Sequence, residues 1–351
     1  MSCTPVHITR PALVPGPHVV DAARIREDIL ARNPDHPQRE TIRKALTNLP
    51  GTRRYLAPYE EIVGERDTRR RKDDTFDTVR RAAAGAARAV LADTGLAPAD
   101  LDCVIVSSAT ADKVPGLGVH LLNDLGLRPE TRIRSTTQAA CAGGALALVM
   151  AEEHLARHPG HIVLVLVGEF LSALYQDSAR TLEDQIYKAL WGDLVSATLV
   201  AARPLGPAPT LRIDHTWEYT LPGTVERYRK VTDERGDHFS STRDSLRSVT
   251  DLAPALRDWL DRNTDGPLDF GVLHPGGPAI LTRLGKVLGV DEEFVRHSRD
   301  VLAEEGNLGG ATLFSVLDRT HRAPPRPGAR GLVFGLGPGV TAAALLTTWT
   351  A

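Results

Sequence analysis

A continuous apolar run at residues 161–168, HIVLVLVG, constrains the fold of this chain most strongly. Strands without polar alternation are buried on both faces, which is typical of sheets that helices cover on either side. A second such run, DCVIVSS, occupies residues 102–108, and alanine-rich stretches at 75–91 and 141–156 have helical periodicity. Buried strands that alternate with helices indicate an α/β fold.

The same order of elements recurs after a proline-rich stretch, ARPLGPAP, at residues 202–209. Beyond it we expect, among other elements, a strand at 269–273 and a helix at 279–288. Two halves of similar order suggest an internal duplication. We therefore divide the chain into an N-terminal half, residues 1–205, and a C-terminal half, residues 206–351.

Composition excludes several classes of protein. The 351 residues are 42% hydrophobic, which is enough for the core of two domains or one duplicated unit. The formal net charge of −2 gives no basic excess for binding nucleic acid or an anionic membrane, and no apolar run approaches the roughly 18 residues of a membrane span. The cysteines, Cys3, Cys103 and Cys141, fit neither a disulfide framework nor metal-ligand spacing, so we expect a cytoplasmic protein without a bound metal.

Cys141 lies in the segment 135–148, STTQAACAGGALAL, where a short strand is expected to end and an apolar helix to begin. Backbone N–H groups and the macrodipole at a helix N-terminus stabilise negative charge, so a thiol there ionises more readily. The thiolate is the nucleophilic form of cysteine. The segment therefore predicts a catalytic cysteine that accepts an acyl group. The alternative interpretation is a buried structural cysteine.

Glycine-rich motifs in the second half contain further candidate catalytic groups. His274 begins HPGGP directly after an expected buried strand, where α/β active sites gather. Asn307 lies in GNLGG before an expected helix, and residues 335–339 form a GLGPG loop. Taken singly, the histidine is a capped loop residue, the asparagine an N-cap and the glycine loop a turn. Their joint occurrence with Cys141 favours a catalytic site.

Together these motifs resemble those of the type III, chalcone synthase-like polyketide synthases of bacterial type, which belong to the thiolase-fold superfamily. The resemblance is carried by HPGGPAIL at 274–281 and by the pairing of GN at 306–307 with a GxGPG loop. It implies a thiolase-like, duplicated fold of αβαβα layers. It also implies an acyltransferase of secondary metabolite biosynthesis in which Cys141, His274 and Asn307 are the catalytic triad.

The chemistry that the resemblance implies suits these residue types. His274 would pair with Cys141 and hold it as a thiolate, ready to accept an acyl starter from coenzyme A. Malonyl-CoA would then lose carbon dioxide, while His274 and Asn307 donate hydrogen bonds to the thioester oxygen of the enolate. Attack on the acyl-cysteine lengthens the chain, which finally cyclises. The expected substrates are malonyl-CoA and an acyl-CoA starter, with no further cofactor.

The resemblance also implies which positions line the substrate pocket. Trp191 takes the place of an aromatic residue that guards the tunnel junction, and Phe239 matches a second gatekeeper, with core packing as the alternative. Tyr187 and Trp191 add bulk whereas Ala109 and Gly309 remove it, so we expect a reshaped, smaller cavity and a short product. The expected pocket residues are Ala109, Val114, Leu171, Leu174, Tyr187, Trp191, Phe239, Gly309, Gly337 and Pro338.

Coenzyme A carries phosphates, so basic residues are expected at the tunnel mouth. By the resemblance, Arg53 and Arg54 in GTRRYL serve this role, and Arg243 and Ala279 are further contacts. Solvated surface arginines are the alternative. Val114 lies on a loop that, in the family, reaches into the partner's cavity, so we expect a homodimer.

Two other classes of function remain open. A ketoacyl synthase III-like condensing enzyme uses the same Cys-His-Asn chemistry with coenzyme A or carrier-protein thioesters, which makes an acyl carrier protein a further candidate partner. A non-catalytic scaffold of a biosynthetic complex is the other class, although it would not need all three residue types. Glu169, at the end of an expected strand, should organise the pocket by hydrogen bonding rather than titrate during catalysis.

Overall fold

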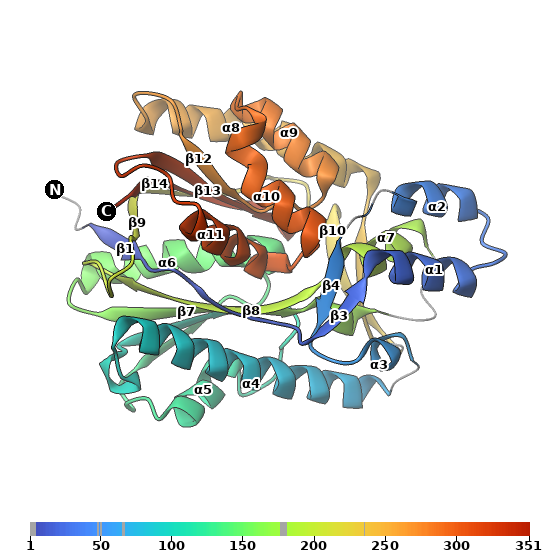
Figure 1. Ribbon diagram of the computed structural model, residues 1–351, viewed down its shortest axis with the longest axis horizontal. Helices are drawn as coiled ribbons and strands as arrows, with labels where there is room; N and C mark the ends of the chain where they lie inside the picture. Colours follow the sequence, from blue (N-terminus) through green and yellow to red (C-terminus); the bar gives the residue numbers. More distant parts are fainter. Residues whose placement is uncertain (1–4, 48, 50, 65–66, 176–180, 235) are drawn as a thin grey trace.

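The computed structural model describes residues 5–351 apart from residues 48, 50, 65–66, 176–180 and 235. Layers of helices and strands alternate from the top to the bottom of Figure 1. Two helices, α6 (Gly143–Arg157) and α11 (Thr312–Arg322), form the middle layer between the two arms of one ten-stranded sheet. This arrangement confirms the expected α/β fold with αβαβα layers.

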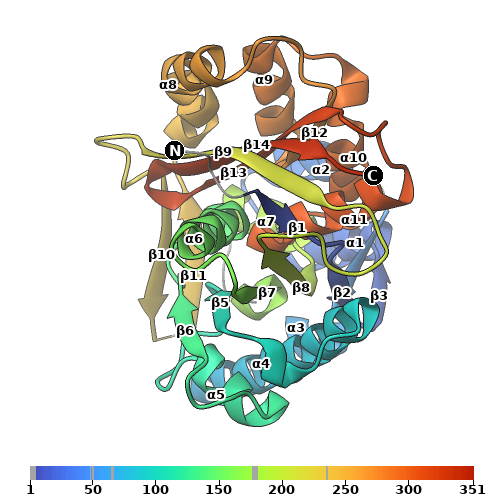
Figure 2. The ribbon, with the colours of Figure 1, turned by 90° about the vertical axis from the view of Figure 1, so that its left-hand side faces the viewer.

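The strand order brings both halves of the chain into one sheet (Figure 2). The first arm consists, from its edge inward, of β6 (Arg132–Ser135), β5 (Cys103–Ser107), β7 (Ile162–Phe170) and β8 (Asp193–Ala201). The second arm consists, from its edge inward, of β12 (Phe270–Leu273), β13 (Arg330–Gly337), β14 (Thr341–Trp349) and β9 (Leu211–Thr220). The short strand β1 (Val6–Ile8) pairs with both β8 and β9 and joins the arms, while β2 (Ala12–Pro15) pairs with β8.

The two arms repeat one structural unit. In the first arm β5 is parallel to β7, α6 precedes β7, and β7 is antiparallel to β8. In the second arm β12 is parallel to β13, α11 precedes β13, and β13 is antiparallel to β14. The N-termini of α6 and α11 are therefore equivalent points of the repeated unit.

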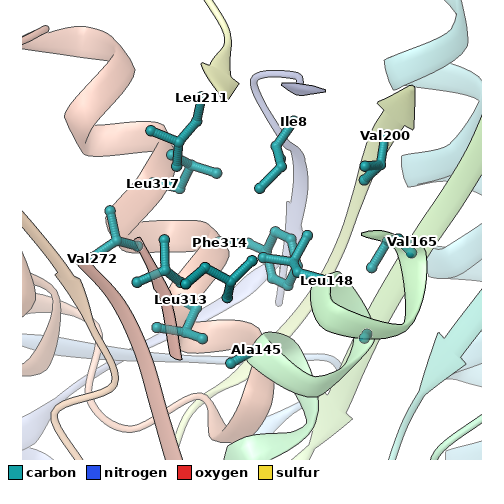
Figure 3. Packing of buried hydrophobic residues seen from close by; sticks show 14 of the residues in the cluster. Ile8, Ala145, Leu148, Val165, Val200, Leu211, Val272, Leu313, Phe314 and Leu317 are labelled. Atoms are coloured by element: carbon teal, nitrogen blue, oxygen red, sulfur yellow. The ribbon is translucent and has the colours of Figure 1, made fainter. Parts of the chain in front are cut away.

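The largest hydrophobic cluster surrounds the middle layer and fixes both helices in place. Helices α6 and α11 contribute buried side chains to it, and strands from both arms contribute most of the rest (Figure 3). Labelled members in Figure 3 include Ala145, Leu148, Val165, Val200, Val272, Leu313 and Phe314. Closely packed interiors have low compressibility. The packing therefore holds the N-terminal ends of the two helices at a fixed separation.

Further helices cover the outer faces of the arms. Helices α4 (Thr68–Thr94) and α5 (Leu117–Leu125) pack on the first arm, and α8 (Ser248–Asn263) and α9 (Pro278–Leu288) pack on the second, where α10 (Glu292–Glu304) adjoins β12. The long α4 begins where the Asp67 side chain accepts a hydrogen bond from the backbone N–H of Arg70 at 2.8 Å, and it ends at Gly95 with φ of 70°. No helix in the described part of the chain has the length and apolar character needed to cross a bilayer.

A smaller group of elements lies beside one end of the sheet, to the right in Figure 1. It comprises β3 (His18–Asp21), α1 (Ala22–Arg32), α2 (Arg39–Thr47), β4 (Thr52–Tyr55), α3 (Tyr59–Val63) and α7 (Leu182–Leu190). A separate hairpin of β10 (Tyr228–Asp233) and β11 (Gly236–Ser241) contacts α7. Helix α7 and this hairpin supply one wall of the cavity described below.

The secondary structure differs from expectation at several places near that cavity. The sequence predicts a loop region with Tyr175, Gln176 and Tyr187 and an irregular polar stretch to about residue 244, whereas the described chain forms α7 and the β10–β11 hairpin within these regions. Gln176 lies outside the described residues. Helix α7 starts at a capping box in which Thr181 and Asp184 bond each other's backbone N–H groups. The helix expected to begin at Cys141 begins at Gly143, after a single 3₁₀ turn.

Candidate active site

Two short turns at the N-terminal ends of the middle helices carry two of the expected catalytic residues. Cys141 is the central residue of a 3₁₀ turn, Ala140–Ala142, directly before α6, and Asn307 lies just before the 3₁₀ turn that starts α11, Gly309–Ala311. A Cβ atom added to Gly144 would lie 2.3 Å from the carbonyl oxygen of Gly310. Contact between backbones at this point therefore brings the cysteine turn and the asparagine turn together.

The backbone at the cysteine turn is unusual. Ala140 has φ of 43°, the left-handed region that side chains other than glycine rarely adopt, and among the described non-glycine residues it alone has a positive φ. Strained conformations of this kind concentrate at functional sites, where surrounding packing holds them. The backbone conformation of Ala140 sets the orientation of the next residue, Cys141, and of its side chain.

The Asn307 side chain is held on three sides. Its amide N–H donates to the carbonyl oxygen of Gly276 at 3.0 Å, and its Oδ1 accepts from the backbone N–H of Gly309 at 2.8 Å. The amide also hydrogen-bonds the Cys141 thiol, which stabilises the thiolate. These contacts go beyond an N-cap and place an amide donor directly at the sulfur.

His274 follows the end of β12, at the position predicted from the sequence. Its backbone N–H donates to the carbonyl oxygen of Phe334 in β13 at 2.8 Å, and its side chain is buried. Burial lowers the pKa of His274 to about 4, so the ring is neutral. Its Nδ1 has no hydrogen-bond partner among the described residues, so no carboxylate orients this ring from behind.

The Cys141 thiol is harder to ionise than its place at a helix N-terminus predicts. Burial raises its pKa to about 12, and the nearby Glu169 carboxylate adds to the rise. The hydrogen bond from Asn307 opposes this effect but is smaller. Burial therefore favours the neutral forms of both Cys141 and His274.

All three groups line one cavity of about 700 Å³. This volume lies within the range of small-molecule sites. Most of the pocket residues predicted from the sequence also line it, as do two of the four predicted coenzyme A contacts. These residues are Ala109, Leu171, Leu174, Tyr187, Trp191, Phe239, Gly309, Gly337, Pro338, Arg243 and Ala279.

Three aromatic rings from separate elements form one side of the cavity. Trp191, just after α7, stacks on Tyr187 with ring centroids 4.8 Å apart, and Phe239 meets Trp191 edge-on at 5.8 Å. The Tyr187 hydroxyl donates to the Ser241 hydroxyl at 2.6 Å and so joins α7 to the hairpin. Phe239 is therefore part of the cavity wall.

Glu169 makes the hydrogen bonds expected of it. The buried carboxylate accepts from the backbone N–H of Ala109, 3.2 Å from each oxygen, and from the Thr110 hydroxyl at 3.2 Å. Burial nevertheless raises its pKa to about 7. Gly309, with φ of 58°, passes so close that an added Cβ would lie 2.8 Å from Cγ of Glu169, so this position requires glycine.

The predicted role of Arg53 in coenzyme A binding needs correction. Its side chain is completely buried and does not line the cavity. Its Nε donates to the carbonyl oxygen of Ala189 at 2.9 Å. A Cβ atom added to Gly306 would lie 2.7 Å from this nitrogen. Arg53 therefore supports the turn that carries Asn307. The backbone N–H of Asn307 donates a hydrogen bond to the carbonyl oxygen of Leu190 at 2.8 Å.

Two other predicted residues also lie off the cavity of this chain. Arg54, half-buried in β4, directs its guanidinium toward the carbonyl oxygen of Gly16 at 3.5 Å. Val114, on the loop between β5 and α5, is 97% exposed and does not line the cavity.

The sequence reasoning missed several residues of the cavity. The most distinctive are Asp112 and Lys230, which place opposite charges on the wall, and Tyr228, which adds a further aromatic group. Tyr228, Lys230 and Thr232 occupy every second position shortly before a segment that contains a glycine. This pattern is the strand signal that could have identified β10. Thr137, Gln138, Leu246 and Ile280 also line the cavity. Within the described ranges, no group of three or more His, Cys, Asp or Glu side chains is arranged to hold a metal ion.

Comparison with known proteins matches nearly the whole chain to one family. Chalcone and stilbene synthases match through their N-terminal domain at residues 29–204 and through their C-terminal domain at residues 214–349. The phloroglucinol synthase of Pseudomonas fluorescens is 30% identical over 322 residues, 90% of this chain and 91% of its own length. The 1,3,6,8-tetrahydroxynaphthalene synthase of Streptomyces coelicolor is 30% identical over 349 residues, 97% of this chain and 92% of its own. The solved structure of germicidin synthase from Streptomyces coelicolor, a type III polyketide synthase, matches with a TM-score of 0.92 at 31% identity and covers 98% of this chain and 99% of that one.

Proposed function

The chain belongs to the chalcone and stilbene synthase family and is a type III polyketide synthase, and from this premise we propose that Cys141, His274 and Asn307 carry its reaction. Enzymes of this family condense coenzyme A thioesters by decarboxylation and need no further cofactor. The observation that carries the assignment is the packing of the cysteine turn on the asparagine turn, with the His274 ring in the same cavity.

Loading of the starter requires a proton acceptor beside the sulfur. The Cys141 thiol attacks the thioester carbonyl of an acyl-CoA, and the neutral imidazole of His274 takes the thiol proton as the carbon–sulfur bond forms. The imidazolium then gives this proton to the departing coenzyme A sulfur. The raised pKa of the thiol and the lowered pKa of the imidazole, both caused by burial, support this order of events over a permanently charged pair.

Chain extension requires a stabilised enolate. When malonyl-CoA loses carbon dioxide, the electron pair of the broken carbon–carbon bond moves toward the thioester oxygen. The Asn307 amide and the His274 ring donate hydrogen bonds to that oxygen. The enolate carbon attacks the acyl group on Cys141, forming the new carbon–carbon bond and breaking the carbon–sulfur bond. The sulfur leaves as a thiolate and takes up one proton from the solvent, because decarboxylation supplies none.

We propose a short acyl starter, few extensions and a small cyclised product. The rings of Trp191, Tyr187 and Phe239 occupy one side of the cavity, which supports a limited chain length. The two relatives described above are named for phloroglucinol and 1,3,6,8-tetrahydroxynaphthalene, both small ring compounds. Arg243 and Ala279 at the cavity, and Arg54 outside it, are proposed contacts of coenzyme A.

We further propose that the chain works as a cytoplasmic homodimer of two-halved subunits, residues 1–205 and 206–351. Two features support a partner: the exposed side chain of Val114, and the position of β6, the strand before Cys141, at the edge of the sheet among the described strands. The thiol of Cys141 forms no disulfide bond within the described residues, which suits a reducing compartment. Carrier-protein donation of the starter, as in a ketoacyl synthase III-like enzyme, and a non-catalytic scaffold are the alternatives, and the family match favours neither.

Mass spectrometry of the intact protein tests the proposal. The protein is incubated with short acyl-CoAs, then with malonyl-CoA, and the released products are analysed. We expect an acyl adduct that maps to Cys141, is absent in Cys141→Ala, and is followed by polyketide release. An adduct without extension would indicate a carrier-dependent enzyme, and no adduct with any donor would leave only the scaffold.

A further inference from the structure

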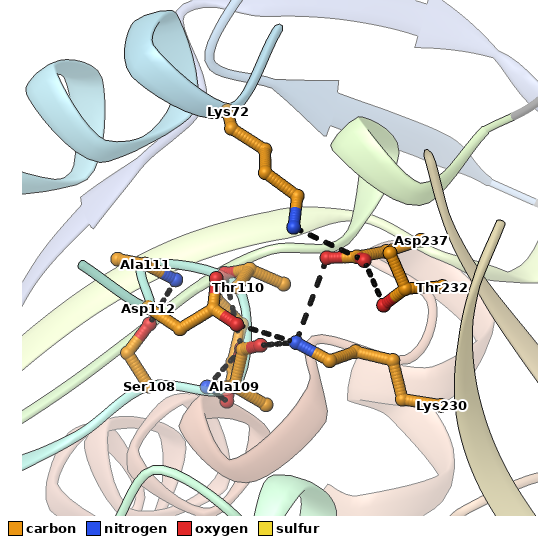
Figure 4. Close-up of polar contacts among 10 residues, drawn as sticks. Lys72, Ser108, Ala109, Thr110, Ala111, Asp112, Lys230, Thr232 and Asp237 are labelled. Carbon is orange, nitrogen blue, oxygen red and sulfur yellow. Dashed lines mark hydrogen bonds and ion pairs between the residues drawn. The ribbon is translucent and has the colours of Figure 1, made fainter. Parts of the chain in front are cut away.

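Lys230 forms a charged bridge across one wall of the Cys141 cavity (Figure 4). Its ammonium is 2.8 Å from Oδ2 of Asp112 and donates to the carbonyl oxygen of Ala109 at 3.3 Å. All three residues line the cavity, but they come from two separate parts of the fold. Asp112 and Ala109 follow β5, whereas Lys230 lies in the β10–β11 hairpin.

The hairpin depends on side-chain contacts for its position. Strands β10 and β11 pair with each other and form a two-stranded sheet apart from the main one. Lys230 is directly opposite Phe239, and Tyr228 is directly opposite Ser241, so these four side chains project from the same face of the hairpin. That face lines the cavity. The hydrogen bond from Tyr187 to Ser241 ties β11 to α7. The Lys230 bridge ties β10 to the segment after β5.

The partners of the ammonium leave it no role in binding a ligand. An ammonium group has three N–H donors, and here three acceptors surround it, because Oδ2 of Asp237 lies 3.5 Å away in addition to Ala109 and Asp112. Asp237 is itself held by the Thr232 hydroxyl at 2.7 Å and by Lys72 at 3.3 Å (Figure 4). The part of Lys230 that remains to face the cavity is its alkyl chain.

From this geometry we infer that Lys230 is a specificity-determining residue: its ion pair with Asp112 and its hydrogen bond to Ala109 clamp the hairpin to the segment after β5, and its alkyl chain forms a wall that limits the acyl chain on Cys141. The inference rests on the proposed function, because it concerns the acyl group that the enzyme loads and extends. The Asp237 side chain is only 10% exposed, so its pair with Lys230 is shielded from water more than an ordinary surface pair.

Substitutions at Lys230 separate the charge from the wall. Lys230→Met keeps an unbranched side chain but removes the ammonium, and Lys230→Ala removes the wall as well. Asp112→Asn weakens the same bridge from its other end. Lys72→Met is the matched control, because Lys72 contacts Asp237 from α4 but does not line the cavity.

The test measures the rate at which straight-chain acyl-CoAs of increasing length acylate Cys141, together with amide hydrogen exchange over residues 228–241. In Lys230→Met and Asp112→Asn we expect hairpin exchange to rise about five-fold, the change that the loss of a partly shielded ion pair produces. In Lys230→Ala we expect about ten-fold faster acylation by the first chain length that the wild type excludes. Lys72→Met should keep the wild-type length profile.

Several outcomes would overturn the inference. The same length profile in the wild type, Lys230→Met and Lys230→Ala would show that Lys230 sets no limit, even if the hairpin exchanges faster. Unchanged exchange in Lys230→Met would remove the clamp. Thermal unfolding of each variant shows whether a change of profile comes from a folded protein. If no acyl-CoA acylates the wild type, the proposed function fails instead, while hydrogen exchange still tests the clamp.

Discussion

Gly144→Ala tests whether contact between the Cys141 turn and the Asn307 turn positions the proposed active site. Gly144 is the second residue of α6, and an added Cβ would lie 2.3 Å from the carbonyl oxygen of Gly310. Alanine is otherwise favoured over glycine in a helix by about 1 kcal/mol. Here the obstacle is backbone, which cannot rotate away as a side chain would. We therefore expect the free energy of unfolding to fall by about 1–3 kcal/mol, as in other overpacked sites.

The same substitution should reduce activity more than stability. Relief of the clash moves the turn that starts α11 away from the turn that carries Cys141, and Asn307 moves with it. A misplacement of about 1 Å between reacting groups costs roughly 100-fold in rate. We expect a loss of this order in the rate of malonyl-CoA decarboxylation by a protein that is still folded.

Gly85→Ala provides the matched control for this prediction. Gly85 lies within α4, and an added Cβ meets nothing within 4 Å. The same chemical change should therefore raise the free energy of unfolding by up to about 1 kcal/mol and leave the rate unchanged. Urea denaturation and a decarboxylation assay measure both quantities. If Gly144→Ala matches Gly85→Ala in stability and rate, the reasoning about the turns is refuted.

Three further predictions concern residues around the cavity. Glu169→Gln should lower the pKa of Cys141, so the rate of its alkylation by iodoacetamide should rise at a lower pH than in the wild type. In the wild type, the free energy of unfolding should fall by up to about 3 kcal/mol as pH rises from 4.5 to about 7, because the native state holds the Glu169 proton more tightly than the unfolded chain. Glu169→Gln should abolish this fall. An unchanged alkylation profile would contradict this prediction. Arg53→Lys should lower the free energy of unfolding by about 1–3 kcal/mol and reduce kcat through Asn307, with KM for acyl-CoA unchanged; a raised KM alone would restore the role in coenzyme A binding. Trp191→Ala should admit longer acyl-CoAs about ten-fold faster by removing the ring that stacks on the wall, and an unaltered acylation profile would count against the aromatic gate.

The layered fold and the grouping of Cys141, His274 and Asn307 in one cavity could be predicted because their sequence signals are local. The run at 161–168 has no polar alternation, and it became β7, buried along its whole length. Cys141, His274 and Asn307 each stand in a motif of small residues next to a predicted strand or helix end. The structure brings all three to one cavity because the elements that carry them repeat one unit.

The cavity wall was harder to predict because its signals are weak or shared with solvent-exposed segments. The β10–β11 hairpin is rich in charged residues, as an exposed loop would be, yet Lys230 and Asp237 pair with each other across its face. Helix α7 is short, and its first turn depends on a capping box rather than on a long apolar stripe. Distance along the chain hides the contact of Lys230 with Asp112.

Arg53 and the pKa of Cys141 show a different limit, which is the cost of burial. A basic pair in GTRRYL looks alike whether its side chains face phosphate or the interior, and only packing shows that Arg53 lies beneath Gly306. A helix N-terminus favours a thiolate, but desolvation at Cys141 is larger and raises the pKa to about 12. The balance between the two depends on neighbours that the local sequence does not contain.

A single-turnover experiment with Asn307→Ala tests the central claim most directly, namely that one site first accepts an acyl group and then extends it. Wild type and variant are first acylated by a short acyl-CoA, then mixed with malonyl-CoA, and the mass of the protein and its released products is followed with time. We expect both proteins to carry the acyl group on Cys141, and the variant to extend it at least about 100-fold more slowly, because it lacks a donor to the enolate oxygen. Extension at the wild-type rate, or an acyl group on another residue, would contradict the account.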